Sequence, residues 1–196
     1  MARPRLISDD DIARATRKAL LKHGPGVPTA RIADMLGVSE ATLFKRMKTR
    51  ERLLIHALGP REAPPFLAML EAGPAAGEDP RAQLVDVLSA ALDFFARLAP
   101  DLVVLKAAGV PLRRVFPKGV APERAVRGAL AGWLHRAFPD ERGRPEPEAA
   151  AELLLGAIES RCFLHYLAGS ELAQADGAAW LKGLVAALYQ PAQPGR

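Results

Sequence analysis

The most constraining feature of this sequence is a pair of short helix-forming segments joined through Gly37. The first segment spans about 29–36, and the second begins directly after Ser39. A glycine adopts the left-handed backbone that closes one helix, and a serine hydroxyl caps the next. Ala33 provides the small side chain that two helices need where they meet at a tight angle. The segment therefore predicts a helix–turn–helix over about 29–47.

Two further helices are expected on either side of this motif. Ser8 followed by Asp11 resembles a capping box, which predicts a helix over about 8–23. Thr49 is the expected cap of another helix over 50–58. The apolar side chains that would lock the motif helices together are those of Ile32, Leu36, Val38, Leu43 and Met47.

Positive charge is concentrated at the N-terminal end. The sequence carries a net +5, but residues 1–56 hold 12 Lys and Arg against 6 Asp and Glu, a net +6. A local basic excess is typical of a protein with a polyanionic partner. Short and basic side chains at the start of a protruding helix suit the major groove of DNA. On the second motif helix, the expected outward side chains are Glu40, Ala41, Thr42 and Lys45.

The segment over about 8–58 resembles the DNA-binding domain of the TetR family of bacterial transcriptional regulators. The coinciding features are Ile32-Ala33, Gly37-Val38-Ser39, Thr42-Leu43-Phe44 and a basic residue before Glu51-Arg52-Leu53-Leu54. The resemblance implies an all-α protein with an N-terminal three-helix helix-turn-helix DNA-binding domain. It also implies a C-terminal helical domain for ligand binding and dimerisation, and a double-stranded DNA operator as partner.

The resemblance further implies roles for individual residues. Thr29 would cap the first motif helix and touch a phosphate. Phe44 stands where the family usually has a phosphate-binding tyrosine, so without the hydroxyl it would only pack. Arg46 and Arg50 would reach phosphates. The residues expected at the DNA are Thr29, Glu40, Ala41, Thr42, Phe44, Lys45, Arg46, Lys48 and Arg50, with Arg3 and Arg5 in an N-terminal arm.

A domain boundary is expected where proline and glycine interrupt the helical pattern. Gly59-Pro60 should end the helix over 50–58, because proline lacks the amide donor that a helix needs. We therefore expect a DNA-binding domain over 1–58 and a regulatory and dimerisation domain over 59–196. The helices predicted in the second domain span about 66–72, 81–98, 101–108, 122–138, 147–168 and 176–189.

The helix over 147–168 has two apolar faces, and each requires a partner. One face carries Leu153, Ala157, Leu164 and Leu167, which would pack in the core of the domain. The other would meet the same helix of a second subunit, giving a two-fold homodimer. The residues expected at this interface are Leu155, Ile158, Cys162 and Tyr166, joined by Leu181, Leu184, Val185 and Leu188 of the last helix.

Large apolar side chains in the second domain are candidates for lining a ligand pocket. Their chemistry favours a small apolar or aromatic effector. The candidates are Phe66, Met69, Phe94, Phe95, Phe116, Trp133 and Phe163.

Several other functions find no support in the sequence. It has no P-loop, no nucleophile elbow and no glycine-rich dinucleotide turn, and its four histidines lack metal-ligand spacing. We therefore expect no catalytic residue, metal or cofactor, and no membrane-spanning helix. A cytoplasmic repressor released from its operator by the effector is the preferred interpretation. An activator or a ligand-free regulator stays open, and a small all-helical enzyme is the remote alternative.

Overall fold

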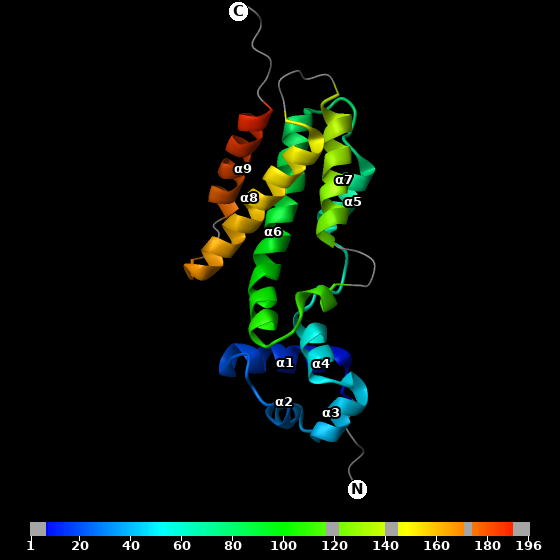
Figure 1. The fold of residues 1–196 in the computed structure, drawn as a ribbon, viewed down its shortest axis with the longest axis vertical. Helices are drawn as coiled ribbons and strands as arrows, with labels where there is room; N and C mark the ends of the chain where they lie inside the picture. Colours follow the sequence, from blue (N-terminus) through cyan, green and yellow to red (C-terminus); the bar gives the residue numbers. More distant parts are fainter. Residues whose placement is uncertain (1–6, 117–121, 140–144, 171–173, 190–196) are drawn as a thin grey trace, which may run out of the picture. The chain divides into compact units, whose positions relative to one another are not determined.

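The computed structural model describes residues 7–116, 122–139, 145–170 and 174–189. Within these ranges every regular element is a helix, which confirms the predicted all-α class (Figure 1). No helix in these ranges is both long and apolar enough to cross a bilayer. The elements are α1 (Asp9–His23), α2 (Thr29–Leu36), α3 (Glu40–Met47), α4 (Arg50–Leu58), α5 (Pro65–Ala72), α6 (Pro80–Ala107), the 3-10 helix η1 (Leu112–Arg114), α7 (Pro122–Ala137), α8 (Pro147–Leu167) and α9 (Gln174–Leu188).

The chain forms two compact units that are not divided at a single point in the sequence. Unit 1 combines Met1–Arg61 with Pro100–Lys118, and unit 2 combines Glu62–Ala99 with Gly119–Arg196. The division expected after residue 58 is close to the first of these boundaries. The predicted division placed residues 100–118 in the regulatory domain, whereas their contacts lie mainly in unit 1.

Unit 1 is built around a small core from α1 to α4, closed by the end of α6 and the residues after it. Apolar residues at helical spacing bury one face of each helix, and each fully buried aliphatic side chain contributes about 1.5–3 kcal/mol. The segment 100–118 adds Leu105, Val110 and Val115 to this core. The other buried members are Ile7, Ile12, Ala19, Leu20, Val27, Ile32, Ala33, Leu43, Met47, Leu53, Leu54 and Leu58.

Local capping explains where the helices of unit 1 begin and end. Ser8 and Asp11 form the predicted capping box at α1, and the Thr49 hydroxyl accepts a hydrogen bond from the Arg52 amide at α4. Gly37 ends α2 with φ 67°, in the left-handed region. The sequence had predicted that Thr29 caps α2, but the structure shows no such cap. Pro28 precedes the helix without a side-chain cap, and Thr29 is its buried first residue.

The helix α6 is continuous through Pro100, so the prediction of separate helices over 81–98 and 101–108 was wrong. Proline removes one backbone hydrogen bond but does not by itself end a helix whose apolar residues are packed on both sides of it. Here Leu98 and Leu105 are both buried. The predicted break after residue 58 is confirmed, because α4 ends at Leu58 and α5 begins at Pro65.

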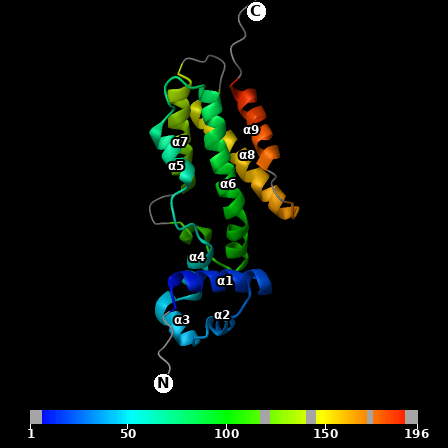
Figure 2. The same cartoon turned by 180° about the vertical axis from the view of Figure 1, so that it is seen from behind.

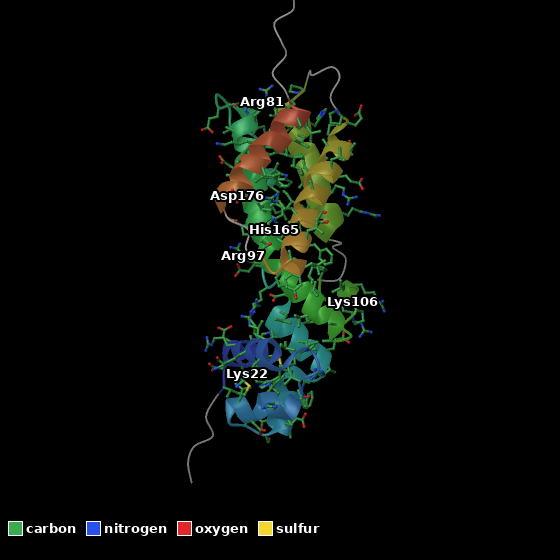
Figure 3. The ribbon with its side chains drawn as sticks, turned by 90° about the vertical axis from the view of Figure 1, so that its left-hand side faces the viewer. Lys22, Arg81, Arg97, Lys106, His165 and Asp176 are labelled. Carbon is green, nitrogen blue, oxygen red and sulfur yellow. The ribbon has the colours of Figure 1, made fainter. Side chains whose placement is uncertain are left out.

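Unit 2 is a helical bundle that includes the first part of α6. Figures 1 and 2 show α9 on the side of α6 away from α5 and α7, while α8 crosses α6 and its first half packs against α7. Its core includes Leu88, Trp133, Ile158 and Val185. Arg81, at the start of α6 and labelled in Figure 3, donates a 2.6 Å hydrogen bond to the carbonyl oxygen of Tyr189, the residue that follows α9.

Candidate nucleic-acid interface and regulatory sites

The helix α3 presents the side chains that the sequence predicted to face outward. Its N-terminus is fixed by Ser39, whose hydroxyl accepts a hydrogen bond from the Thr42 amide at 3.1 Å. Leu43 and Met47 anchor the opposite face in the core of unit 1. A rigid helix with a short polar and basic outer face results. The exposed residues on it are Glu40, Ala41, Thr42 and Lys45, and Phe44 is half-buried.

Arg50 is held by the backbone of its own unit. Its guanidinium donates hydrogen bonds to the carbonyl oxygens of Val27, at 2.6 Å, and Pro25, at 2.8 Å. These contacts tie the start of α4 to the loop between α1 and α2. Arg50 thus has a structural role, and because these bonds use two of its five N–H donors, the expected phosphate contact stays a prediction.

Arg46 is also engaged inside unit 1. Its Nε lies 2.9 Å from a carboxylate oxygen of Asp9, and its guanidinium donates to the carbonyl oxygen of Ile7. The last turn of α3 is thereby joined to the first turn of α1. The phosphate contact expected of Arg46 stays a prediction, because its side chain is exposed and keeps further N–H donors. The expected arm residues Arg3 and Arg5 lie outside the described residues.

Lys45 and Lys48 differ from these two arginines. Both side chains are exposed, and neither has a hydrogen bond or ion pair among the described residues. Thr29 is buried at the start of α2, so little of it is available to a phosphate. Within the segment 40–50, the two lysines are the cations without a hydrogen-bond or ion-pair partner among the described residues.

Three of the seven predicted pocket residues lie together in unit 2. Phe66, Phe94 and Phe95 form a cluster with ring centroids 5.5–6.1 Å apart, and Met69 is exposed on the same helix as Phe66. Edge-on aromatic packing of this kind stabilises a core and also offers an apolar wall. Phe94 and Phe95 are only half-buried, which leaves part of the cluster accessible.

The other aromatic candidates lie elsewhere. Trp133 is fully buried in the core of unit 2 and packs edge-on against Phe138. Phe116 packs against the core of unit 1, and Phe163 is exposed on α8. Their role in lining a pocket stays a prediction, because sequence spacing alone does not show which helix faces meet.

A groove of about 660 Å³ lies between α7 and the start of α8. Small residues of α7 and several charged residues line it, whereas the expected pocket was lined by large apolar side chains. Arg127 on one wall lies 3.6 Å from a Glu152 carboxylate oxygen on α8. The residues that line the groove are Arg124, Arg127, Gly128, Ala131, Gly132, His135, Glu146, Pro147 and Glu148.

The two apolar faces of α8 have the opposite environments from those predicted. Most of the residues expected at a dimer interface are buried in the chain's own core, namely Leu155, Ile158, Cys162, Leu181 and Val185. Tyr166 is 37% accessible, and Leu184 and Leu188 are half-buried. The face predicted to be internal is the exposed one, with Leu153 56%, Leu164 60% and Leu167 61% accessible.

Cys162 is a buried thiol inside unit 2. Burial raises its pKa to about 11, and its Sγ lies 3.7 Å from the carbonyl oxygen of Leu92. A thiol of this kind is protonated at neutral pH and packs as an apolar side chain. In the part of the chain that the structure describes, no three His, Cys, Asp or Glu residues gather into a potential metal site.

Comparisons with solved structures identify the fold. A TetR transcription regulator from Haloarcula marismortui superposes with a TM-score of 0.67 at 21% identity, over 93% of this chain and 98% of that one. FadR of Bacillus subtilis in complex with stearoyl-CoA gives 0.66 at 16% identity, over 91% and 97%. The chain has the TetR-like fold.

A third solved structure with the TetR-like fold is SmeT of Stenotrophomonas maltophilia, the repressor of the multidrug efflux pump SmeDEF. Its TM-score is 0.63 at 15% identity, with 97% of this chain and 96% of SmeT covered. No protein-family model and no curated protein matches the sequence. The likeness is therefore one of backbone architecture, carried through both units of the chain.

Proposed function

We propose that this protein is a DNA-binding transcriptional regulator of the TetR type. The observation that carries the proposal is the outer face of α3, where Glu40, Ala41, Thr42 and Lys45 are exposed on a helix anchored by Leu43 and Met47. Side chains of this kind at the start of a rigid helix read base edges in the major groove. The net +6 of residues 1–56 supplies the long-range attraction to a phosphate backbone.

The experiment begins with selection of bound duplexes from a random DNA library, followed by affinity measurements on the selected sequence. Lys45→Ala is expected to weaken binding by ~1–3 kcal/mol and to relax the preference at one base position. Lys18→Ala, which removes an exposed lysine of α1, is the matched control and should retain that preference. Absence of any selected sequence, or an unchanged preference in Lys45→Ala, contradicts this docking.

We infer that the regulator acts as a homodimer through the exposed face of α8. Leu153, Leu164 and Leu167 recur at three- and eleven-residue intervals, so they lie along one side of the helix. Exposed leucines aligned on one side of a helix favour a surface that a partner covers. A second copy can present the same face about a two-fold axis, and a palindromic operator requires such a pair.

The effector is proposed to be a small molecule with an apolar or aromatic part that contacts the cluster of Phe66, Phe94 and Phe95. The half-burial of Phe94 and Phe95 supports this position. FadR of Bacillus subtilis, which shares the fold, was solved with stearoyl-CoA, a ligand with a long apolar chain. Stearoyl-CoA is therefore the first probe, with coenzyme A alone as the control for its polar part.

The expected result is a lower DNA affinity in the presence of stearoyl-CoA and no change with coenzyme A. Phe94→Ala should reduce this response while DNA binding in the absence of the probe stays the same. A higher DNA affinity with the probe favours an activator or a co-repressed regulator. No effect from a panel of acyl and aromatic probes favours a ligand-free regulator. A bound probe that leaves DNA affinity unchanged contradicts the proposed effector role.

A further inference from the structure

Lys48, between α3 and α4, has an unusual backbone conformation. Its φ is 68° and its ψ is −48°, and it is the one non-glycine residue with a positive φ in the described ranges. The six other residues with positive φ there are all glycine. A side chain with a Cβ is strained in this region, whereas glycine is not. The chain thus carries lysine at the kind of position that it elsewhere gives to glycine.

The conformation is fixed by hydrogen bonds on both sides of Lys48. Its amide donates to the Phe44 carbonyl oxygen at 2.8 Å, and the Thr49 amide donates to the Met47 carbonyl oxygen at 2.8 Å. The second bond closes a γ-turn centred on Lys48, a rare and strained form. Because the turn joins α3 to α4, its geometry is set by the packing of the two helices and does not depend on the lysine side chain.

The lysine side chain gives the fold no hydrogen bond or ion pair, among the described residues, that would offset this strain. It is exposed, and it has no hydrogen-bond or ion-pair partner among the described residues. Residues kept in strained conformations without structural benefit cluster at functional sites. The neighbouring guanidiniums of Arg46 and Arg50 contact Asp9 and the carbonyls of Val27 and Pro25, so they also serve the fold. Lys48 is the cation of this turn that stays free.

We propose that Lys48 is retained against its backbone strain as a sequence-independent contact to a DNA phosphate. This inference rests on the proposed DNA-binding function. Base-reading residues lie at the start of the recognition helix, and Lys48 follows its end, where the duplex backbone is the available partner. An ammonium on a flexible stem acts as a point charge and suits a phosphate. The contact would fix the position of α3 on the duplex without reading its sequence.

Three substitutions separate charge from strain. Lys48→Gly removes both, Lys48→Gln removes the charge and keeps the strain, and Lys48→Arg keeps both. Each variant is measured as the full-length protein by thermal melting and by titration with a selected duplex and a scrambled duplex over a range of salt. Lys22→Gln, at an exposed lysine of α1, is the charge-matched control.

We expect Lys48→Gly to melt a few degrees above the wild type and Lys48→Gln to melt close to it. Both should lose roughly tenfold in affinity per subunit on both duplexes. The slope of log affinity against log salt should become shallower by about 0.9 per subunit. Lys48→Arg should retain wild-type affinity and slope.

Wild-type affinity and salt slope in both Lys48→Gly and Lys48→Gln would overturn the phosphate contact while the proposed DNA binding stands. So would a loss confined to the selected duplex, which indicates base reading. A lower melting temperature for Lys48→Gly overturns the strain argument. A wild-type protein that binds neither duplex overturns the proposed function together with this inference.

Discussion

Arg17 of α1 donates a 2.7 Å hydrogen bond to the carboxylate of Asp101, 84 positions further along the chain. The Asp101 side chain is largely buried, and burial raises its pKa although Arg17 opposes the shift. The stability of a buried carboxylate depends on its partner, because burying an unpaired charge costs free energy. The pair attaches the last turns of α6 to the first helix of unit 1.

We predict that the loss of Arg17 depends on pH. Arg17→Ala should lower the free energy of unfolding by about 1–2 kcal/mol at pH 7, since it leaves the Asp101 carboxylate without its donor. Without Arg17 the pKa of Asp101 rises further, so the acid becomes protonated and the penalty shrinks as the pH falls toward 4. Asp101→Asn in the Arg17→Ala background should abolish this pH dependence. Urea denaturation at pH 4 and pH 7 measures the free energy of unfolding of each variant. An equal loss of stability in Arg17→Ala at the two pH values argues against the pairing.

Leu105 should fold together with α1 to α4 of unit 1. It is fully buried in the core of unit 1, so Leu105→Ala should cost ~2–5 kcal/mol by leaving a cavity. Val104→Ala, at a half-buried neighbour, is the control and should cost much less. Hydrogen exchange locates the effect. Faster exchange is expected in α1 and α4 of the Leu105→Ala variant. Faster exchange only in unit 2 would refute the assignment of Leu105 to the core of unit 1.

A charge introduced on one face of α8 should affect dimerisation, and a charge on the other face should affect folding. Leu164→Glu places a charge on the exposed face, so the subunit should stay folded and sediment as a monomer. Ile158→Asp places a charge in the core, so it should unfold the subunit. Circular dichroism and analytical ultracentrifugation distinguish the outcomes. A Leu164→Glu variant that sediments with the wild type would show that this face does not form the interface.

Cys162 should be unreactive in the folded protein. With the pKa raised from the usual value of 9.0 to about 11, the thiolate fraction at pH 7 falls on the order of 100-fold. Alkylation by iodoacetamide should therefore follow unfolding, and adding urea should accelerate it. The same shift predicts that this thiol's contribution to stability holds below pH 9 and is lost as the pH rises from 9 to 11. Rapid alkylation in native buffer would contradict the burial of this residue.

Local sequence chemistry was sufficient to predict the motif of unit 1. Gly37, Ser39 and the Ser8–Asp11 capping box act through hydrogen bonds and dihedral angles within a few residues, so they specify helix ends before any packing exists. The outward set of α3 follows from the same periodicity, because Leu43 and Met47 fix which side faces the core.

Tertiary structure decided what local patterns left open. The hydrophobic pattern of α8 has two apolar faces of similar character, and only packing against α6, α7 and α9 selects the one with Ile158 as the core. Arg46 and Arg50 find their partners at Asp9, Pro25 and Val27, over 20 or more positions, so no local rule distinguishes them from free cations. The sequence alone determines which residues can form a helix face. The fold determines what each face meets, because burial is a property of the whole packed chain.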